Sequence, residues 1–146
     1  MTIGVAIVVV CLVLRSCGGE QRLEKSFFEQ PLGSRVERLR EYPLPDRYRI
    51  FRYGNDEIEP PLMDLAGPIA ERGAAAVPFL LDRLREAGND VEEIRDILLI
   101  FERMAASGSY DVKSDQLVMD TLQKSIDRAP YGRDFLLVML HRIQRT

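Results

Sequence analysis

Two groups of residues in this chain are of types that could do acid–base chemistry. His141 is the single histidine, and Glu92, Glu93 and Asp96 form a small cluster of carboxylates. Paired carboxylates can divide the roles of acid and base, and a histidine can activate a nucleophile. The sequence places no nucleophile near His141, and acids at the start of a helix are already favoured by the helix dipole. We therefore predict no catalytic residue and no enzymatic activity.

A metal or disulfide framework is also not predicted. Asp56, Glu57 and Glu59 form an acidic loop, but their spacing is not that of a calcium-binding EF-hand loop. The chain has two cysteines, Cys11 and Cys17, and none after them. The sequence thus predicts no metal site, no cofactor and no disulfide scaffold for the region beyond Cys17.

Basic and aromatic residues alternate between Arg35 and Tyr53. Such a mixture can bind single-stranded nucleic acid or anionic lipid headgroups. In the interpretation that we favour, the aromatic side chains are core and the arginines are solvated or paired with nearby acids. Among functional uses, contact with headgroups or a partner is preferred, and a formal net charge of -3 argues against a nucleic-acid partner. The candidate contact residues are Arg35, Arg38, Arg47, Arg49 and Arg52.

The first residues form an unbroken apolar run from Ile3 to Leu14. As a helix this run would be about 18 Å long, whereas the hydrocarbon core of a bilayer is about 30 Å thick. Its length suits the apolar region of an export signal better than a membrane span. An uncleaved anchor and a buried amino-terminal strand remain alternatives.

The end of this run carries a more specific pattern, Leu14-Arg15-Ser16-Cys17, followed by Gly18-Gly19. It resembles the lipobox of bacterial lipoprotein signals, which it matches at Leu14, Ser16 and Cys17. It departs from that pattern at Arg15, and no Lys or Arg precedes the apolar run. The resemblance implies that Cys17 carries lipid. The protein would then be anchored in the cell membrane, facing the periplasm or the exterior, with a single-pass anchor as the alternative.

The rest of the chain reads as a tether and an all-α domain. Residues 1–16 would be the signal or anchor, residues 17–31 a polar tether, and residues 32–146 a helical domain. Pro68 predicts a break near residues 64–67, and a strand is the alternative for residues 48–53. The expected helices are 34–42, 45–54, 62–72, 75–87, 91–107, 114–128 and a last helix from about Phe135 to Ile143.

The helix expected at 91–107 has the clearest pattern. Its apolar stripe consists of Ile94, Ile97, Leu98, Phe101 and Met104. Its polar face would carry Glu92, Arg95, Asp96 and Arg103. Ser34, Asp90 and Ser114 are the expected caps at helix starts, and Gly108 is the expected stop.

Residues 69–84 contain a Gly turn followed by Ala-Val-Pro-Phe-Leu-Leu. This segment resembles a HEAT repeat, in which such a turn joins two antiparallel helices. The resemblance implies hairpins 62–72/75–87 and 91–107/114–128, stacked as a short α-solenoid or an irregular α-bundle. HEAT-like units usually act as scaffolds, an expectation that rests on fold analogy.

The leading functional interpretation is a membrane-anchored helical protein that binds a protein partner and has no catalytic role. Its binding face would be lined by the second helices of the hairpins, with Arg83, Glu86, Lys124 and Asp127. One alternative is an enzyme or small-ligand binder with a pocket near Tyr48, Tyr53 and His141. The other is a cytosolic inhibitor or immunity-type protein whose apolar run packs against its helices.

Overall fold

A computed structural model describes residues 23–146, which form helices, turns and loops with no strand among them. The predicted all-α class is therefore confirmed for this part of the chain. The apolar run and Cys17 lie outside the described residues. The chain divides into two compact units, Met1–Arg35 and Val36–Thr146, and each is described by itself.

In the first unit, residues 23–28 are helical and the 3₁₀ helix η1 follows at Leu32–Ser34. Part of the predicted polar tether is thus a helix. The side chain of Arg35 binds the end of this helix, because its guanidinium donates to the carbonyls of Phe28 at 2.6 Å and Gln30 at 3.1 Å. The same guanidinium lies 5.2 Å from the centre of the Phe28 ring.

The prediction that Ser34 caps the start of a helix is wrong. η1 runs directly into α2, which spans Arg35–Leu39, so the amide of Arg35 already bonds to the carbonyl of Leu32. The Ser34 hydroxyl instead donates backwards to the Pro31 carbonyl at 3.1 Å.

The second unit continues with α3, Leu44–Asp56, which is helical throughout and excludes the strand alternative. The 3₁₀ helix η2, Met63–Ala66, then leads into α4, Gly67–Ala70. Pro68 sits in the first turn of α4, where a missing amide hydrogen costs nothing. The predicted break at residues 64–67 is therefore present.

A further 3₁₀ turn, η3 at Gly73–Ala76, precedes α5, Val77–Glu86. The long helix α6 spans Val91–Ser107, and the Asp90 side chain caps it by accepting from the amides of Glu92 and Glu93 at 3.1 Å each. Gly108 ends α6 with a φ of 69°. Both predicted ends of this helix are confirmed.

The last two helices are α7, Gln116–Arg128, and α8, Arg133–Arg145. Ser114 does not cap α7, because it belongs to the 3₁₀ turn η4, Val112–Ser114. Asp115 takes the position instead, and its carboxylate accepts from the amide of Val118 at 3.1 Å.

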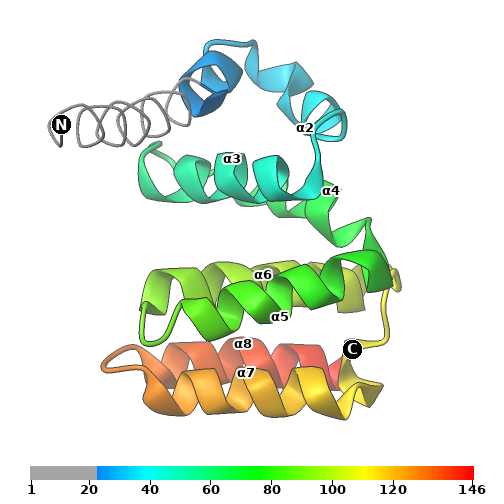
Figure 1. Cartoon of the computed structure of the whole chain (residues 1–146), viewed down its shortest axis with the longest axis vertical. Helices are drawn as coiled ribbons and strands as arrows, with labels where there is room; N and C mark the ends of the chain where they lie inside the picture. The colour runs from blue at the N-terminus through cyan, green and yellow to red at the C-terminus, as the bar shows by residue number, and fades with distance from the viewer. Residues whose placement is uncertain (1–22) are drawn as a thin grey trace, which may run out of the picture. The chain divides into compact units, whose positions relative to one another are not determined.

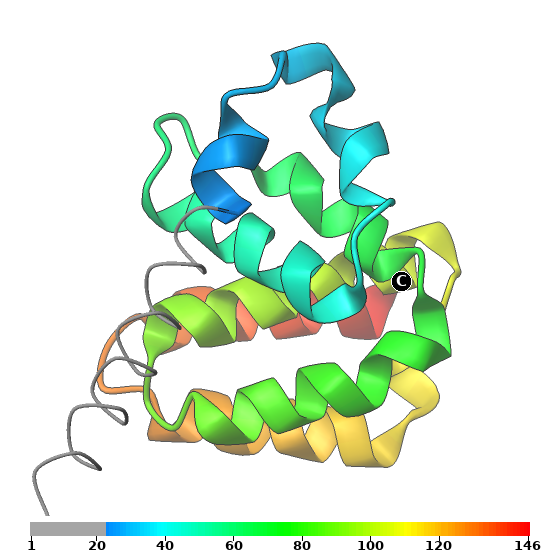
Figure 2. The ribbon, with the colours of Figure 1, turned by 45° about the horizontal axis from the view of Figure 1, so that its top comes forward.

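Within the second unit the helices form two rows (Figures 1 and 2). α4, α6 and α8 follow one another in one row, while α5 and α7 lie side by side in the other. The second helices of the two predicted hairpins, α5 and α7, thus line one side together.

The core of this unit centres on α6. The predicted stripe of Ile94, Ile97, Leu98, Phe101 and Met104 is completely buried. Asp96, which we expected on a solvent face, is also completely buried. That expectation is wrong because α6 is the middle helix and has neighbours on the side where its acids lie.

Candidate functional site

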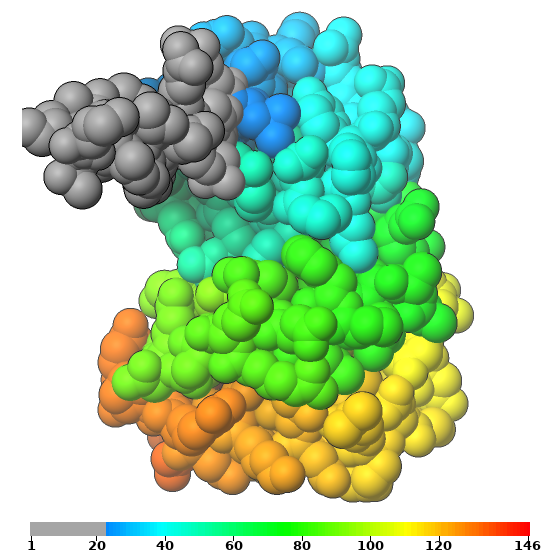
Figure 3. Space-filling model, in the orientation of Figure 1, coloured from blue at the N-terminus to red at the C-terminus, as the bar shows by residue number. Residues whose placement is uncertain are grey.

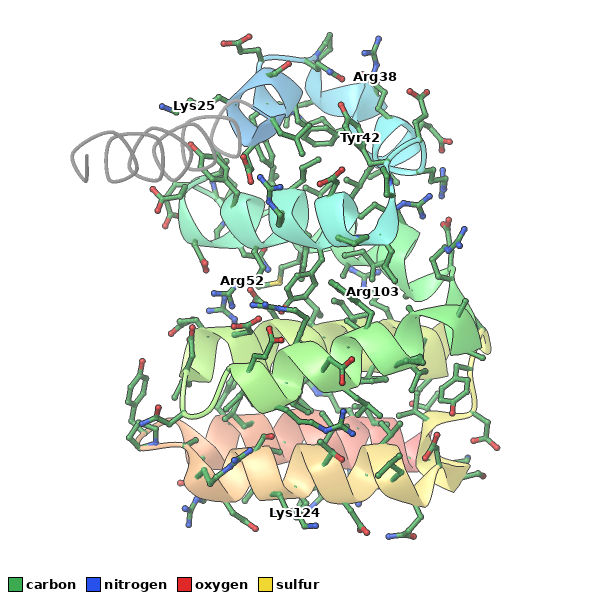
Figure 4. All side chains as sticks on the ribbon, viewed as in Figure 1. Lys25, Arg38, Tyr42, Arg52, Arg103 and Lys124 are labelled. Carbon is green, nitrogen blue, oxygen red and sulfur yellow. The ribbon has the colours of Figure 1, made fainter. Side chains whose placement is uncertain are left out.

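A polar cluster joins α3 to α6 around the carboxylate of Asp96. Its Oδ2 accepts from Arg52 Nη1 at 3.3 Å, and its Oδ1 accepts from Asn55 Nδ2 at 3.0 Å and from Arg95 Nη2 at 2.8 Å. Arg52 also pairs with Asp56 at 3.2 Å. Figure 4 shows Arg52 between α3 and the layer of α5 and α6. The buried charge of Asp96 is therefore met by donors from two helices.

A second buried acid, Glu93, lies one turn before Asp96 on α6. Its Oε1 accepts from the Tyr48 hydroxyl at 2.9 Å and from Arg83 Nη2 at 2.6 Å. The Arg83 guanidinium lies 5.6 Å from the centre of the Tyr48 ring, and Phe79 meets the same ring edge-on with centroids 5.4 Å apart. Glu93 thus connects α3, α5 and α6.

Burial and charge act in opposite directions on these groups. Burial raises the pKa of the Asp96 carboxyl, whereas the hydrogen bond and charge of Arg95, together with Arg52, act to lower it. Burial also raises the pKa of Tyr48, and the nearby Glu93 carboxylate raises it further. Tyr48 therefore stays protonated at neutral pH and acts as a hydrogen-bond donor.

The arginines proposed for headgroup contact lie in different settings. Arg47 is buried and donates to the carbonyls of Tyr42 at 2.7 Å and Pro68 at 2.8 Å. Because its guanidinium is hydrogen-bonded inside the fold, Arg47 is poorly placed to contact a lipid headgroup. Arg49 pairs with Asp46 at 3.5 Å. Arg38 is exposed on α2, while Arg35 and Arg52 make the bonds given above.

The predicted binding face on α5 and α7 is brought together in part. Arg83 turns towards Glu93 and also pairs with Glu86 at 2.7 Å. Lys124 and Asp127 line an open hollow of about 500 Å³ between the two helices. Figure 3 shows α5 and α7 adjacent on this face, and Figure 4 places Lys124 on α7. The residues around the hollow are Arg85, Leu117, Thr121, Lys124, Asp127 and Arg128.

The three residues of the predicted small-ligand pocket do not share one environment. Tyr48 is buried, Tyr53 is half-buried on α3, and His141 is exposed on α8. A cavity of about 210 Å³ lies elsewhere and has a mostly apolar wall. Its lining residues are Asn55, Pro61, Met63, Arg95, Leu99, Glu102, Phe135, Met139 and Arg142.

No family model, curated protein or solved structure matches the chain. Within residues 23–146, no group of His, Cys, Asp and Glu side chains is arranged to hold a metal ion. In the same range, no helix has the length and apolarity needed to cross a bilayer.

Sequence reasoning missed the polar cluster, although a signal for it exists. Arg52 and Asn55 are three residues apart on α3, and Glu93 and Asp96 are three residues apart on α6. Each pair therefore shares one helix face. Complementary polar pairs on two helices indicate a polar contact between them, whereas the acids on α6 taken alone look like a solvated first turn.

Proposed function

We propose that the protein is a non-catalytic helical binding module held at a membrane by its amino-terminal segment. The site for its partner is the hollow between α5 and α7, referred to below as the α5–α7 face. The membrane part of the proposal rests on the apolar run and the lipobox-like residues around Cys17. The binding part rests on the α5–α7 face and on the resemblance to HEAT-type scaffolds.

The observation that carries the binding proposal is the composition of the α5–α7 face. Leu117 is 59% exposed there, and the hollow is also lined by the basic side chains of Arg85, Lys124 and Arg128 and by the acid Asp127. Arg85 in addition pairs with Asp82 at 2.6 Å. An exposed apolar side chain in a hollow lined by more basic than acidic groups suits a partner segment that places an apolar side chain among acids.

The non-catalytic part of the proposal follows from how the buried acids are used. Glu93 and Asp96 accept hydrogen bonds from tyrosine, asparagine and arginine side chains that hold α3 and α5 on α6. A general base must be within reach of a substrate proton. These carboxylates are instead committed to neighbouring helices.

Cell fractionation tests the membrane part. We expect the full chain, with a carboxy-terminal tag, to enter the membrane fraction and to incorporate labelled palmitate. Cys17→Ala should abolish incorporation, because the acyl chains need the thiol. Cys11→Ala is the matched control and should leave both incorporation and fractionation unchanged.

Two outcomes would contradict this part. Incorporation of palmitate that survives Cys17→Ala excludes lipidation at this residue. A wild-type chain found in the soluble fraction excludes the anchor altogether.

Recovery of a partner tests the binding part. The tagged full chain is isolated from solubilised membranes as wild type and as Leu117→Asp. Burying a leucine side chain is worth about 1.5–3 kcal/mol, and each 1.4 kcal/mol is about tenfold in affinity. We therefore expect Leu117→Asp to reduce recovery of any specific partner by about tenfold or more.

Met63→Asp is the matched control, because Met63 is 51% exposed on η2, which packs against α3, α4 and α6. It should leave recovery unchanged. A partner recovered equally with wild type, Met63→Asp and Leu117→Asp would show that the α5–α7 face is not its site.

A further inference from the structure

The outward side of α8 carries an unusual combination of exposed side chains. Phe135 is 56% exposed and Val138 is 48% exposed. At 3.6 residues per turn, these two and four exposed polar residues fall within about 120° of the helix circumference. We call this surface the α8 outer face, and it consists of Asp134, Phe135, Val138, His141, Arg142 and Arg145.

The opposite side of α8 is the core side. Leu136, Met139, Leu140 and Ile143 are buried there, where α8 packs against α6 and α7. The α8 outer face lies outside this buried set, and Phe135 and Val138 remain about half exposed on it.

Charge is distributed unevenly along the α8 outer face. Its amino-terminal half holds the acid Asp134 and the ring of Phe135, while its carboxy-terminal half holds His141, Arg142 and Arg145. Val138 lies between the two halves. The face is thus acidic and aromatic at one end and basic at the other.

If a second copy of α8 runs in the opposite direction, its acidic half faces the basic half of the first copy. We propose that two copies of this chain pair through their α8 outer faces, with the two α8 helices antiparallel and Val138 near the two-fold axis. Asp134 of each copy then faces the basic half of the other, and Phe135 lies among guanidinium groups, as in cation–π contacts. A parallel pair would bring the basic halves together. A two-fold interface uses the same patch on both copies.

The position of Arg142 fits this arrangement. Its Nη1 lies 3.5 Å from Glu102 Oε1 on α6, and its side chain remains 59% exposed. Arg142 also borders the apolar cavity that Phe135 and Met139 line. The guanidinium is therefore held beside the rim of an apolar surface, where a second copy's aromatic ring can reach it.

The pair is expected to be weak in dilute solution, because one helix face buries less than a standard interface. Holding both copies on one membrane raises their effective concentration. The pairing itself uses only α8 and does not depend on the α5–α7 face.

Sedimentation of the full chain in neutral detergent micelles tests the proposal. Wild type should be in monomer–dimer equilibrium at protein concentrations up to about 100 µM. Val138→Asp should raise the dissociation constant of the dimer at least tenfold. Leu117→Asp on α7 is the control and should leave the equilibrium unchanged. Far-UV circular dichroism checks that each variant remains helical.

A charge exchange gives the sharper result. Asp134→Arg makes the α8 outer face wholly basic, and the double variant His141→Glu, Arg145→Glu makes it predominantly acidic. Each should be monomeric alone, and an equimolar mixture should form dimers that weaken as salt is added.

Three outcomes overturn the proposal. Wild type could remain monomeric throughout the concentration range. Its dimer could persist in Val138→Asp, which would place the contact elsewhere in the chain. The mixed charge variants could also fail to associate. A monomeric wild type whose Val138→Asp variant loses a recovered partner would assign the face to that other protein.

Discussion

The carboxylate of Asp96 accepts hydrogen bonds from side chains on two helices while it is completely buried. Removing one member of a buried ion pair usually costs about 3–5 kcal/mol, because it leaves the remaining charge without a partner. Arg52 and Arg95 are less confined, since their side chains are 20% and 31% exposed and reach other acids. The cost at Asp96 should be somewhat below that range.

We predict that Asp96→Ala lowers the free energy of unfolding by about 2–3 kcal/mol. Asp82→Ala removes the acid of an exposed pair, Arg85–Asp82 at 2.6 Å, and should cost less than about 1 kcal/mol. Urea unfolding followed by circular dichroism measures both. Equal losses in the two variants would show that burial of Asp96 has no energetic role.

Asp115 differs from Asp96, because its hydrogen bonds outweigh its burial and lower its pKa, whereas burial dominates at Asp96 and raises its pKa. The hydrogen bond from the Tyr110 hydroxyl, followed by that from the Val118 amide, holds the pKa of Asp115 below its usual value. A lowered folded-state pKa means that the unfolded chain binds the proton more readily. The stabilisation is then complete above the unfolded pKa of about 3.9 and is lost as the pH falls through the folded value.

We predict that Asp115→Ala costs about 1 kcal/mol at pH 7, the usual effect of losing a helix cap. The difference from wild type should shrink as the pH falls below about 4. Asp111→Ala removes a neighbouring exposed acid that makes no cap bond to α7, and its effect should be smaller at pH 7. A difference between Asp115→Ala and wild type that grows on acidification would contradict the assignment.

At the scale of helices, the pattern of apolar residues and prolines predicted most elements. The stripe on α6 and its ends at Asp90 and Gly108 are confirmed, because capping and periodicity are local properties. The helix expected at 62–72 is instead a 3₁₀ turn followed by the short α4. Pro68 indicated that break, but the residue at which one helical form changes into another depends on packing.

The polar cluster could not be predicted in the same way. Whether Glu93 and Asp96 face solvent depends on which helix covers that side of α6, and this is a long-range property. The α5–α7 face could be predicted from the sequence only in part. A repeat pattern indicated that α5 and α7 share a side, whereas the turn of Arg83 towards Glu93 required the tertiary structure.

The first residue of η3, Gly73, allows the backbone geometry of this turn to be tested. Gly73 has a φ of 53°, and a Cβ added there would lie 2.5 Å from the backbone oxygen of Ser109. Gly88 has a φ of 59°, with no atom within 4 Å of an added Cβ. The two glycines share a backbone conformation and differ in the space around them.

We predict that Gly88→Ala costs about 1–2 kcal/mol, the penalty of the left-handed conformation. Gly73→Ala should cost about 1–3 kcal/mol more, because the η3 turn or the loop at Ser109 must move. Thermal unfolding of the two variants measures the difference. Equal losses would show that the approach to Ser109 relaxes without cost.

At the scale of the second unit, two rows of helices determine which surfaces remain available. α6 lies in the middle, between α4 and α8 in its own row and against α5 and α7 in the other. The α5–α7 face and the α8 outer face use different sides of this arrangement. A partner and a second copy could therefore bind at the same time.

The central position of α6 also has a kinetic consequence. A backbone amide exchanges its hydrogen with solvent only when its hydrogen bond opens, and the most enclosed helix opens last. Deuterium uptake should therefore be slowest in α6 and faster in the flanking α5, α7 and α8. The order of exchange would then follow how completely each helix is enclosed by its neighbours.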